Sequence, residues 1–331
     1  MLQLLLLILL LSLMLWNLLS GELALPWVGI LWDLVPLSPP QPELALSPSQ
    51  HWVLYTLRLP RTLVAVGSGI ALALAGTLTQ GLTRNPLASP STLGFTSAAA
   101  LAALSLVILA PTAPLWLFPL AALGGAMAAV LLLTLLLPQA NFSPLRLVLA
   151  GLGLGLGATA VVQILLTIGE LRQVNQALFW VTGSVYGRTW AQVMLLWVGL
   201  GLGLPALWIQ SRTLDVLALG EDLAQGLGVS LGTQRRWLLG WSVGLTAIAV
   251  ATAGSVGFVG LMAPHLARQW VGTRHRLLLP VAGLIGGILV TGADGLGRCL
   301  FAPVEIPCGV ITALLGGPYF LYLLVRSRPN R

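Results

Sequence analysis

The chain has 331 residues, of which 57% are apolar and only 8% are charged, and its formal net charge at pH 7 is +7. A soluble domain usually carries about 25% charged residues, so this composition excludes an ordinary soluble enzyme, a disordered tail and a coiled coil. It indicates an all-α integral membrane protein with most of its mass inside lipid.

The charged residues limit the chemistry further. All 16 basic residues are arginines, and without lysine the chain cannot form a Walker-type phosphate loop of its own. The arginines are scattered between apolar runs, which is typical of membrane loops and argues against nucleic-acid binding. Cys299 and Cys308 have no metal-ligand spacing and are expected to be small apolar packing residues, with a disulfide as the alternative. We expect no catalytic site, metal or cofactor in this chain.

Apolar runs in chain order predict the membrane spans. The first run, Met1 to Ser20, lacks the basic start of a signal peptide, because the first basic residue is Arg58. The run is also about long enough to cross a bilayer, so we expect a retained span rather than a cleaved signal. The clear runs are 1–20, 63–82, 93–110, 115–137, 147–169, 190–209, 277–293 and 307–325.

The stretch from Trp237 to Pro264 is too long for one span, and the glycine-rich segment 253–257 would allow a reversal within it. If 237–271 crosses twice, eleven arginines fall on the side of the N-terminus and five on the other. A single crossing gives six and ten. The positive-inside rule favours the double crossing, which predicts ten spans with both termini cytoplasmic.

Tryptophans mark several predicted span ends, as interface anchors do. They are residues 180, 190, 208, 237 and 270.

Three connections between the spans are long. Residues 21–60 are predicted to form a Pro-rich outer loop that carries Glu22, Asp33 and Glu43, and residues 170–189 an outer segment with a short helix. Residues 211–236 form the largest inner connection, in which leucines alternate with acids and glycines interrupt any long helix. We expect two short helices lying flat on the cytoplasmic side, either as a solvated connector or as a docking surface for a soluble partner. No composition break divides the chain, so 1–331 is predicted to be one domain.

Two features inside the spans have structural interpretations. Glycines 151, 153, 155 and 157 alternate in an apolar run; they lack the order of a dinucleotide fingerprint and are expected to allow close helix packing or to line a smooth pathway wall. Asp294 ends an apolar run near Arg298, so its charge is expected at the outer edge of the membrane.

The stretch LRLPRTLVAVGSGIALALAGTLTQGLTRNPLASPSTLG (57–94) resembles the signature of the FecCD-type permeases, the membrane subunits of ATP-driven importers for iron-siderophores, haem and cobalamin. Further resemblances follow in family order: LVLAGLGLG (147–155), FWVTGSVYG (179–187), LDVLALGEDLAQGLGV (214–229), GSVGFVGLMAPHLAR (254–268), ADGLGR (293–298) and EIPCGVITALLGGPYFLYLL (305–324). The resemblance implies the type II importer architecture of ten spans per subunit. It also implies a second copy or a paralogous permease, cytoplasmic ABC ATPase subunits and an external substrate-binding protein.

The resemblance also implies roles for individual residues. Arg58, Arg61 and Arg298 match arginines that dock the binding protein, for which a planar guanidinium fork suits carboxylates. The residues that match the ATPase-coupling region are Leu217, Leu219, Gly220, Glu221, Ala224 and Gly228. Those that match the cytoplasmic gate are Phe142, Ser143 and Pro144.

These observations predict a multi-pass permease of the bacterial plasma (inner) membrane that works by alternating access and carries a metal chelate, with ferric siderophore as first choice. A cobalamin or haem permease of the same family is the alternative. An ion-coupled secondary transporter is a further alternative, but it would place paired carboxylates within the spans.

Overall fold

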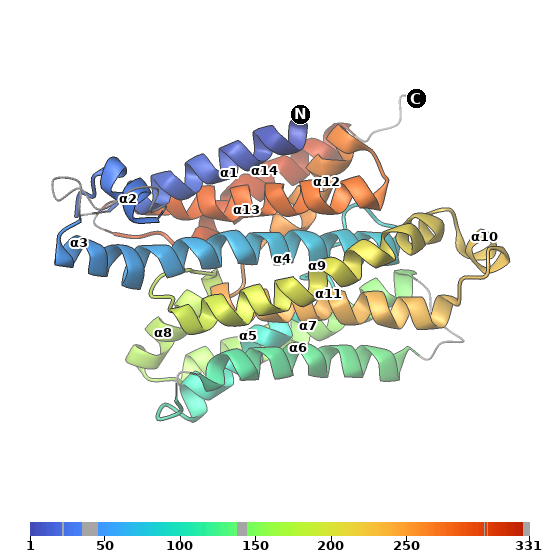
Figure 1. Cartoon of the computed structure of the whole chain (residues 1–331). Helices are drawn as coiled ribbons and strands as arrows, with labels where there is room; N and C mark the ends of the chain where they lie inside the picture. Colours follow the sequence, from blue (N-terminus) through green and yellow to red (C-terminus); the bar gives the residue numbers. More distant parts are fainter. Residues whose placement is uncertain are drawn as a thin grey trace.

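The computed structural model of the chain describes residues 1–21, 23–34, 46–114, 116–137, 144–300, 302 and 304–326, and in these residues it contains helices and no strand (Figure 1). The long helices are α1 (Leu2–Leu19), α4 (Leu59–Thr83), α5 (Phe95–Leu109), α6 (Leu117–Leu136), α7 (Pro144–Ile168), α9 (Trp190–Ala218), α11 (Leu231–Ala253), α12 (Val259–Val271), α13 (His275–Cys299) and α14 (Cys308–Arg326). The short elements are α2 (Trp27–Leu34), α3 (Pro48–Trp52), the π-helical turn η1 (Val53–Arg58), α8 (Leu171–Thr182) and α10 (Glu221–Gly226).

A helix of the described chain corresponds to each of the ten predicted spans. Seven helical stretches are long and apolar enough to cross a bilayer, and α5 and residues 308–323 of α14 are shorter apolar helices. Helix α12 has only 13 residues. The chain is therefore an all-α protein with the apolar helices of a membrane protein, and the number of ten crossings stays a prediction. The break inside 237–271 falls where the glycines predict it, because α11 ends at Ala253 and α12 begins at Val259.

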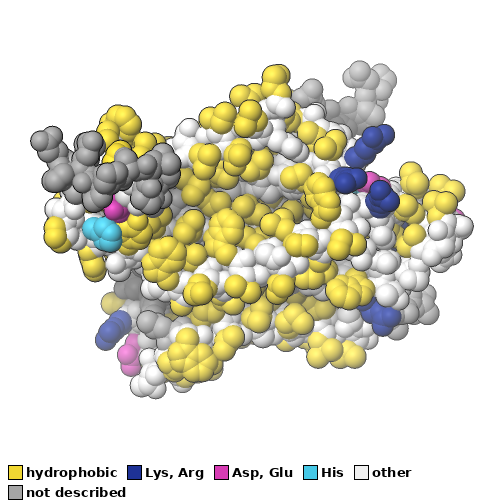
Figure 2. Space-filling model, viewed as in Figure 1, with side chains coloured by type: hydrophobic (Ala, Val, Ile, Leu, Met, Phe, Trp, Pro, Cys, Tyr) yellow, Lys and Arg dark blue, Asp and Glu magenta, His cyan; other side chains and the backbone are white. Residues whose placement is uncertain are grey.

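The surface of the helix bundle is apolar in its middle and charged toward its ends. Figure 2 shows hydrophobic side chains over the central part of the visible face, with arginines toward the end that carries α10 and both charge signs near the end that carries α3 and α8. We refer to these as the α10 end and the α3 end. Of the expected interface anchors, Trp190, Trp208, Trp237 and Trp270 are exposed, whereas Trp180 is buried.

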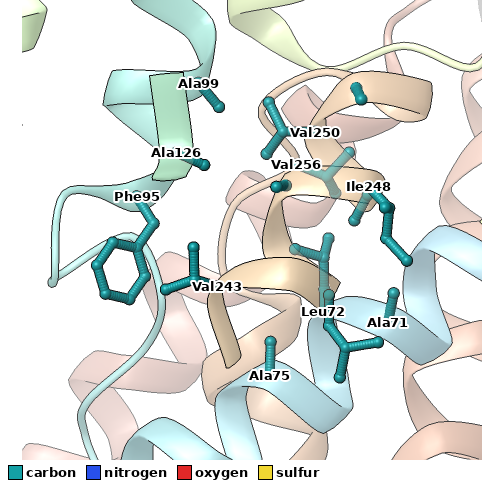
Figure 3. Close-up of a cluster of buried hydrophobic side chains, with 14 of the residues drawn as sticks. Ala71, Leu72, Ala75, Phe95, Ala99, Ala126, Val243, Ile248, Val250 and Val256 are labelled. Carbon is teal, nitrogen blue, oxygen red and sulfur yellow. The ribbon is translucent and has the colours of Figure 1, made fainter. Parts of the chain in front are cut away.

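Helix α4 forms the centre of the fold. It is almost entirely buried and packs against α13, α11, α12 and α9. Figure 3 shows the core at one of these contacts: Ala71, Leu72 and Ala75 of α4 lie near Val243 and Ile248 of α11. Small side chains on α4 let its neighbours approach closely, so the helix is fixed in position along its length.

Glycines set the closest contacts between helices. A Cβ added at Gly69 of α4 would lie 2.2 Å from the carbonyl oxygen of Gly286 on α13. In α7, Cβ atoms at Gly151 and Gly155 would meet the backbone of residues 93–94, whereas those at Gly153 and Gly157 would meet nothing within 4 Å. The alternating glycines of α7 thus divide into a packing face at 151 and 155, as expected, and an open face.

Two predicted connections differ from the structure. The predicted outer loop 21–60 contains helical structure. It includes α2, and α3 and η1 continue directly into α4, so that helical structure runs from Pro48 to Thr83. The segment 211–236 does not contain two short helices, because α9 extends to Ala218 and only α10 is a separate short helix. Leu214 and Leu217 are buried, and this packing extends α9 beyond its expected end. The helix predicted within 170–189 is confirmed as α8.

Candidate functional site

At the α3 end, Arg61 connects three parts of the chain. It lies in the first turn of α4, and its Nε and Nη2 donate to the carboxylate of Asp294 on α13, with N···O distances of 2.8–3.1 Å. Its Nη1 donates to Glu305, between α13 and α14, at 2.9 and 3.1 Å. Arg61 is 8% exposed and Asp294 is 2% exposed, so the charges of this pair are removed from water and compensate each other.

Arg58 is held by backbone oxygens at the end of α1. Its Nη1 donates to the carbonyls of Leu18 and Leu19 at 2.6 and 3.2 Å, and its Nη2 donates to that of Leu23 at 2.5 Å. A cation at a helix C-terminus interacts favourably with the helix dipole and with carbonyls that have no partner in the helix. Arg58 is the last residue of η1, and π-helical turns recur at functional sites.

Arg298 completes the group from α13. Its Nη2 donates to the backbone oxygen of Asn17 at 2.9 Å and also to the Asn17 side chain, and its Nη1 donates to Ser20 at 3.2 Å. The same guanidinium is 3.7 Å from Asp294. The side chain of Asn17 in turn donates to the carbonyl of Thr291 on α13 at 2.9 Å. These polar contacts fasten the end of α1 to α13.

The outer network, named for the side of the membrane on which the sequence predicts it, brings together the three arginines that the sequence singled out. Its members are Arg58, Arg61, Arg298, Asp294 and Glu305. It holds three guanidinium groups and two carboxylates. Glu305 is its most accessible carboxylate, with a side chain 35% exposed. The expected proximity of Asp294 to Arg298 is confirmed, but the closer pairing with Arg61 was not expected from the sequence, because 233 residues separate the two.

At the α10 end, two glycines with positive φ flank a short exposed helix. Gly220 has φ of 122° and Gly228 has φ of 83°, conformations that other residues rarely adopt. Between them, α10 packs on α9 and α11 through the fully buried Ala224. The glycines thus allow the chain to leave α9, form α10 and enter α11 over a few residues.

The coupling segment, residues 219–230, exposes leucines. Leu219, Leu223 and Leu227 are 62%, 60% and 65% exposed, although Leu217 and Ala224 are buried. Of the residues matched to the coupling region, Leu219 is therefore on the surface, Leu217 and Ala224 are in the packing, and Gly220 and Gly228 form the turns. Glu221 begins α10, and its side chain is outside the described part of the structure.

One contact near the coupling segment was missed by the sequence reasoning. Oδ1 of Asp215 on α9 accepts from the backbone N–H of His275 at 2.8 Å and lies 2.7 Å from its Nδ1. His275 is the first residue of α13 and is buried. The contact joins the end of α9, which leads into α10, to the helix whose other end carries Asp294 and Arg298. No local sequence signal marks it, because its members are 60 residues apart.

The structure also bears on the predicted gate residues, on the two cysteines and on metal binding. Phe142 and Ser143 lie outside the described residues, and Pro144 begins α7 with its side chain outside the description. Cys299 is exposed and Cys308 is buried, and both are free thiols, so the alternative of a disulfide between them is wrong for this structure. Among the described residues, no group of three His, Cys, Asp or Glu side chains is placed to hold a metal ion.

Comparisons of the sequence and of the structure with known proteins agree with one another. Residues 5–326 match the family described as the FecCD transport family. The chain is 41% identical over 281 residues to a Fe(3+)-citrate import system permease protein of Bacillus subtilis, covering 85% of this chain and 84% of that one. It is 40% identical to the Fe(3+) dicitrate transport system permease protein FecD of Escherichia coli, covering 93% of each chain. A solved inward-facing structure described as a metal-chelate type ABC transporter is 31% identical, with a TM-score of 0.85 over 98% of this chain and 99% of that chain.

Proposed function

The chain belongs to the FecCD transport family, and from this premise we propose that it is the membrane-spanning permease subunit of an ATP-binding cassette importer for a ferric chelate. The observation that carries the proposal is the family match over residues 5–326, which includes both the outer network and the coupling segment. In this proposal the chain performs no covalent chemistry, and ATP is hydrolysed by partner subunits.

We propose that the coupling segment receives the ATPase. The exposed side chains of Leu219, Leu223 and Leu227 favour this role, because apolar surface gains about 25 cal/mol for each Å² that a partner removes from water. The turns at Gly220 and Gly228 would let α10 move with the partner while α9 and α11 keep their packing. Nucleotide that binds two states of the ATPase with different affinity would then shift the permease between outward-open and inward-open states.

We propose that the outer network receives an external substrate-binding protein. Arg58, Arg61 and Arg298 already have partners within the chain, so a docking carboxylate must share or replace them. Three guanidinium groups facing two carboxylates leave one surplus positive charge, which favours an acidic partner. Glu305 is the partner most easily exchanged, because it is partly exposed and bonds only to Nη1 of Arg61.

We propose that the pathway lies between this chain and a second copy or a paralogous permease. The open face of α7, with Gly153 and Gly157, and the exposed apolar side chains of α14, such as Leu314 and Tyr322, are suited to such a partner or to a smooth wall. A bulky chelate would find few polar groups there to retain it.

The cargo that fits best is a ferric chelate of the citrate or siderophore type. The two curated relatives described above are named for Fe(3+)-citrate and Fe(3+) dicitrate, which supports iron over cobalamin as the first choice. Haem and cobalamin remain the alternatives within the family. We place the chain in the bacterial plasma membrane with the α10 end and both termini in the cytoplasm, as the arginine distribution predicts.

An ion-coupled carrier is a weaker proposal. Such a carrier uses a carboxylate that exchanges protons or ions during transport. Asp294 is the buried carboxylate of the outer network, and it is compensated by two hydrogen-bonding nitrogens of Arg61. A carboxylate held in this way is suited to fixing helices rather than to releasing its partner in each cycle.

Association with an ATPase tests the proposal. The chain is co-expressed with a candidate ABC ATPase subunit, solubilised in mild detergent and purified through a tag on the ATPase. We expect the unchanged chain to co-purify and the variant with aspartate at 219, 223 and 227 to be lost. Retention of that variant would contradict the assignment of the coupling segment, and Leu171→Asp, at an exposed leucine of α8 near the α3 end, serves as the matched control.

A further inference from the structure

An apolar crevice lies between α4, α9 and α13. Its volume is about 430 Å³, and its lining includes Leu74, Leu204, Pro205, Trp208, Leu279 and Pro280. Both prolines are inside their helices, where proline removes a backbone hydrogen bond and bends the helix. Two such interruptions on facing helices keep α9 and α13 from packing tightly, and the crevice is the space that results.

Arginines stand at the α10 end of this crevice. The guanidinium of Arg276 lies over the ring of Trp208, 5.4 Å from its centroid, and Arg276 is one helical turn before Pro280. Arg212 is exposed and lies one turn beyond Trp208 on α9. Residues three and four apart share a helix face, so both arginines continue the faces that line the crevice.

Neither Arg212 nor Arg276 forms an ion pair with a carboxylate of the described residues. Asp215, three residues after Arg212 on α9, is hydrogen-bonded to His275 instead. Figure 2 shows arginine side chains at this end of the visible face, with an acidic side chain among them, beside the apolar central surface. An exposed pair of guanidinium groups next to an apolar crevice is complementary to a molecule with an anionic group and a hydrocarbon chain.

We propose that the crevice binds one anionic phospholipid, with an acyl chain along Leu204 and Leu279 and the phosphate on Arg212 and Arg276. Guanidinium groups pair with phosphate oxygens through two parallel hydrogen bonds, and tryptophan favours the boundary between headgroups and hydrocarbon, where Trp208 would lie. Basic pockets between membrane helices are suited to lipid headgroups. The bound lipid fills the gap left by the prolines and joins α9, which leads into α10, to α13.

Native mass spectrometry of the purified full-length chain tests the proposal. The chain in detergent is titrated with phosphatidylglycerol and with phosphatidylcholine of the same acyl chains. We expect phosphatidylglycerol to bind more tightly, and the double variant Arg212→Gln, Arg276→Gln to bind it about thirtyfold more weakly, since each of the two arginines near a headgroup contributes on the order of 1 kcal/mol. Equal affinity for the two lipids, or full affinity of the double variant, would overturn the proposal.

Two further variants separate the crevice from surface charge. Leu204→Trp fills the crevice while both arginines stay, and we expect it to weaken phosphatidylglycerol binding. Unchanged binding would show that the crevice holds no acyl chain of the lipid. Arg172→Gln removes an exposed arginine of α8, outside the crevice, and is the control. An equal loss with Arg172→Gln would mean that the lipid responds only to net charge, against the proposal. Thermal unfolding in detergent verifies that each variant is folded. We expect millimolar inorganic phosphate not to displace the lipid; displacement would show that the site binds phosphate alone, against the proposal.

Discussion

At the α3 end, arginines and carboxylates are packed between α1, α4 and α13, whereas at the α10 end three leucines stand exposed around a short helix. The outer network satisfies its charges with partners from the same chain, and Arg61 alone makes five hydrogen bonds to carboxylate oxygens. Leu219, Leu223 and Leu227 have no comparable cover within the described chain. The difference indicates that the outer network contributes to the stability of the permease itself, while the coupling segment exposes apolar surface that, in our proposal, a partner covers.

The largest expected effect on stability is at Asp294. Asp294→Asn leaves the buried guanidinium of Arg61 without its main counter-charge, and breaking a buried pair in this way costs about 3–5 kcal/mol. We expect a correspondingly lower free energy of unfolding, measured by denaturant titration in detergent. Asp222→Asn, at an exposed position of α10, is the matched control and should change little. Equal stability of the Asp294 variant would show that the outer network does not hold the fold together.

A second, smaller effect is expected at Asp215. Asp215→Ala removes the acceptor for the backbone N–H and the ring Nδ1 of His275, which is buried at the start of α13. Leaving such donors unpaired costs about 1–3 kcal/mol. The same titration measures it, and Asp215→Asn, which keeps an oxygen acceptor, should lose less. If the two variants are equally destabilised, the hydrogen bond is not the source of the effect.

Glu305 should matter less for stability than Asp294, because its carboxylate is partly exposed. Glu305→Gln is expected to cost at most about 1 kcal/mol, the range measured for accessible ion pairs. It also removes the negative charge that pairs with Nη1 of Arg61, so a substrate-binding protein should bind the reconstituted transporter more tightly, which surface plasmon resonance can measure. Weaker binding would mean that Glu305 contributes to the docking surface rather than competing with it.

The smallest effect per substituted position is expected at the coupling segment. Aspartate at 219, 223 and 227 together should change the free energy of unfolding of the isolated chain by no more than about 0.5 kcal/mol at each position, since exposed side chains contribute little to packing. Leu217→Asp, at a buried position on the same stretch, is the contrasting variant and should be strongly destabilised. Loss of stability in the triple variant would show that these leucines pack within the chain after all.

The sequence predicts the helical fold well because apolar runs and glycine breaks are local signals. The interruption near Gly254 and the helix within 170–189 were both expected and are present. The extension of α9 to Ala218 was not expected, because it depends on the burial of Leu217 against distant helices. Length and composition were sufficient to predict the apolar helices but not where each helix ends in space.

The candidate site was predictable in its residue types but not in its contacts. The three outer arginines were singled out, yet the sequence placed them only at the outer surface, whereas Arg58 and Arg61 are buried with partners from α1 and α13. The partners of Arg58 and Arg61 lie 35 to 244 residues away along the chain. Only the packing of α1 and α13 on α4 brings these partners close. Whether these arginines also dock a binding protein stays a prediction.

ATP-driven uptake by the reconstituted complex tests the central proposal most directly. Proteoliposomes contain this chain, its ATPase partner and internal ATP, and receive binding protein loaded with a radioactive ferric chelate. We expect accumulation that requires ATP and is lost in the variant with aspartate at 219, 223 and 227, whose isolated chain is still folded. Accumulation driven by an ion gradient with this chain alone, or undiminished ATP-driven uptake by that variant, would contradict the account.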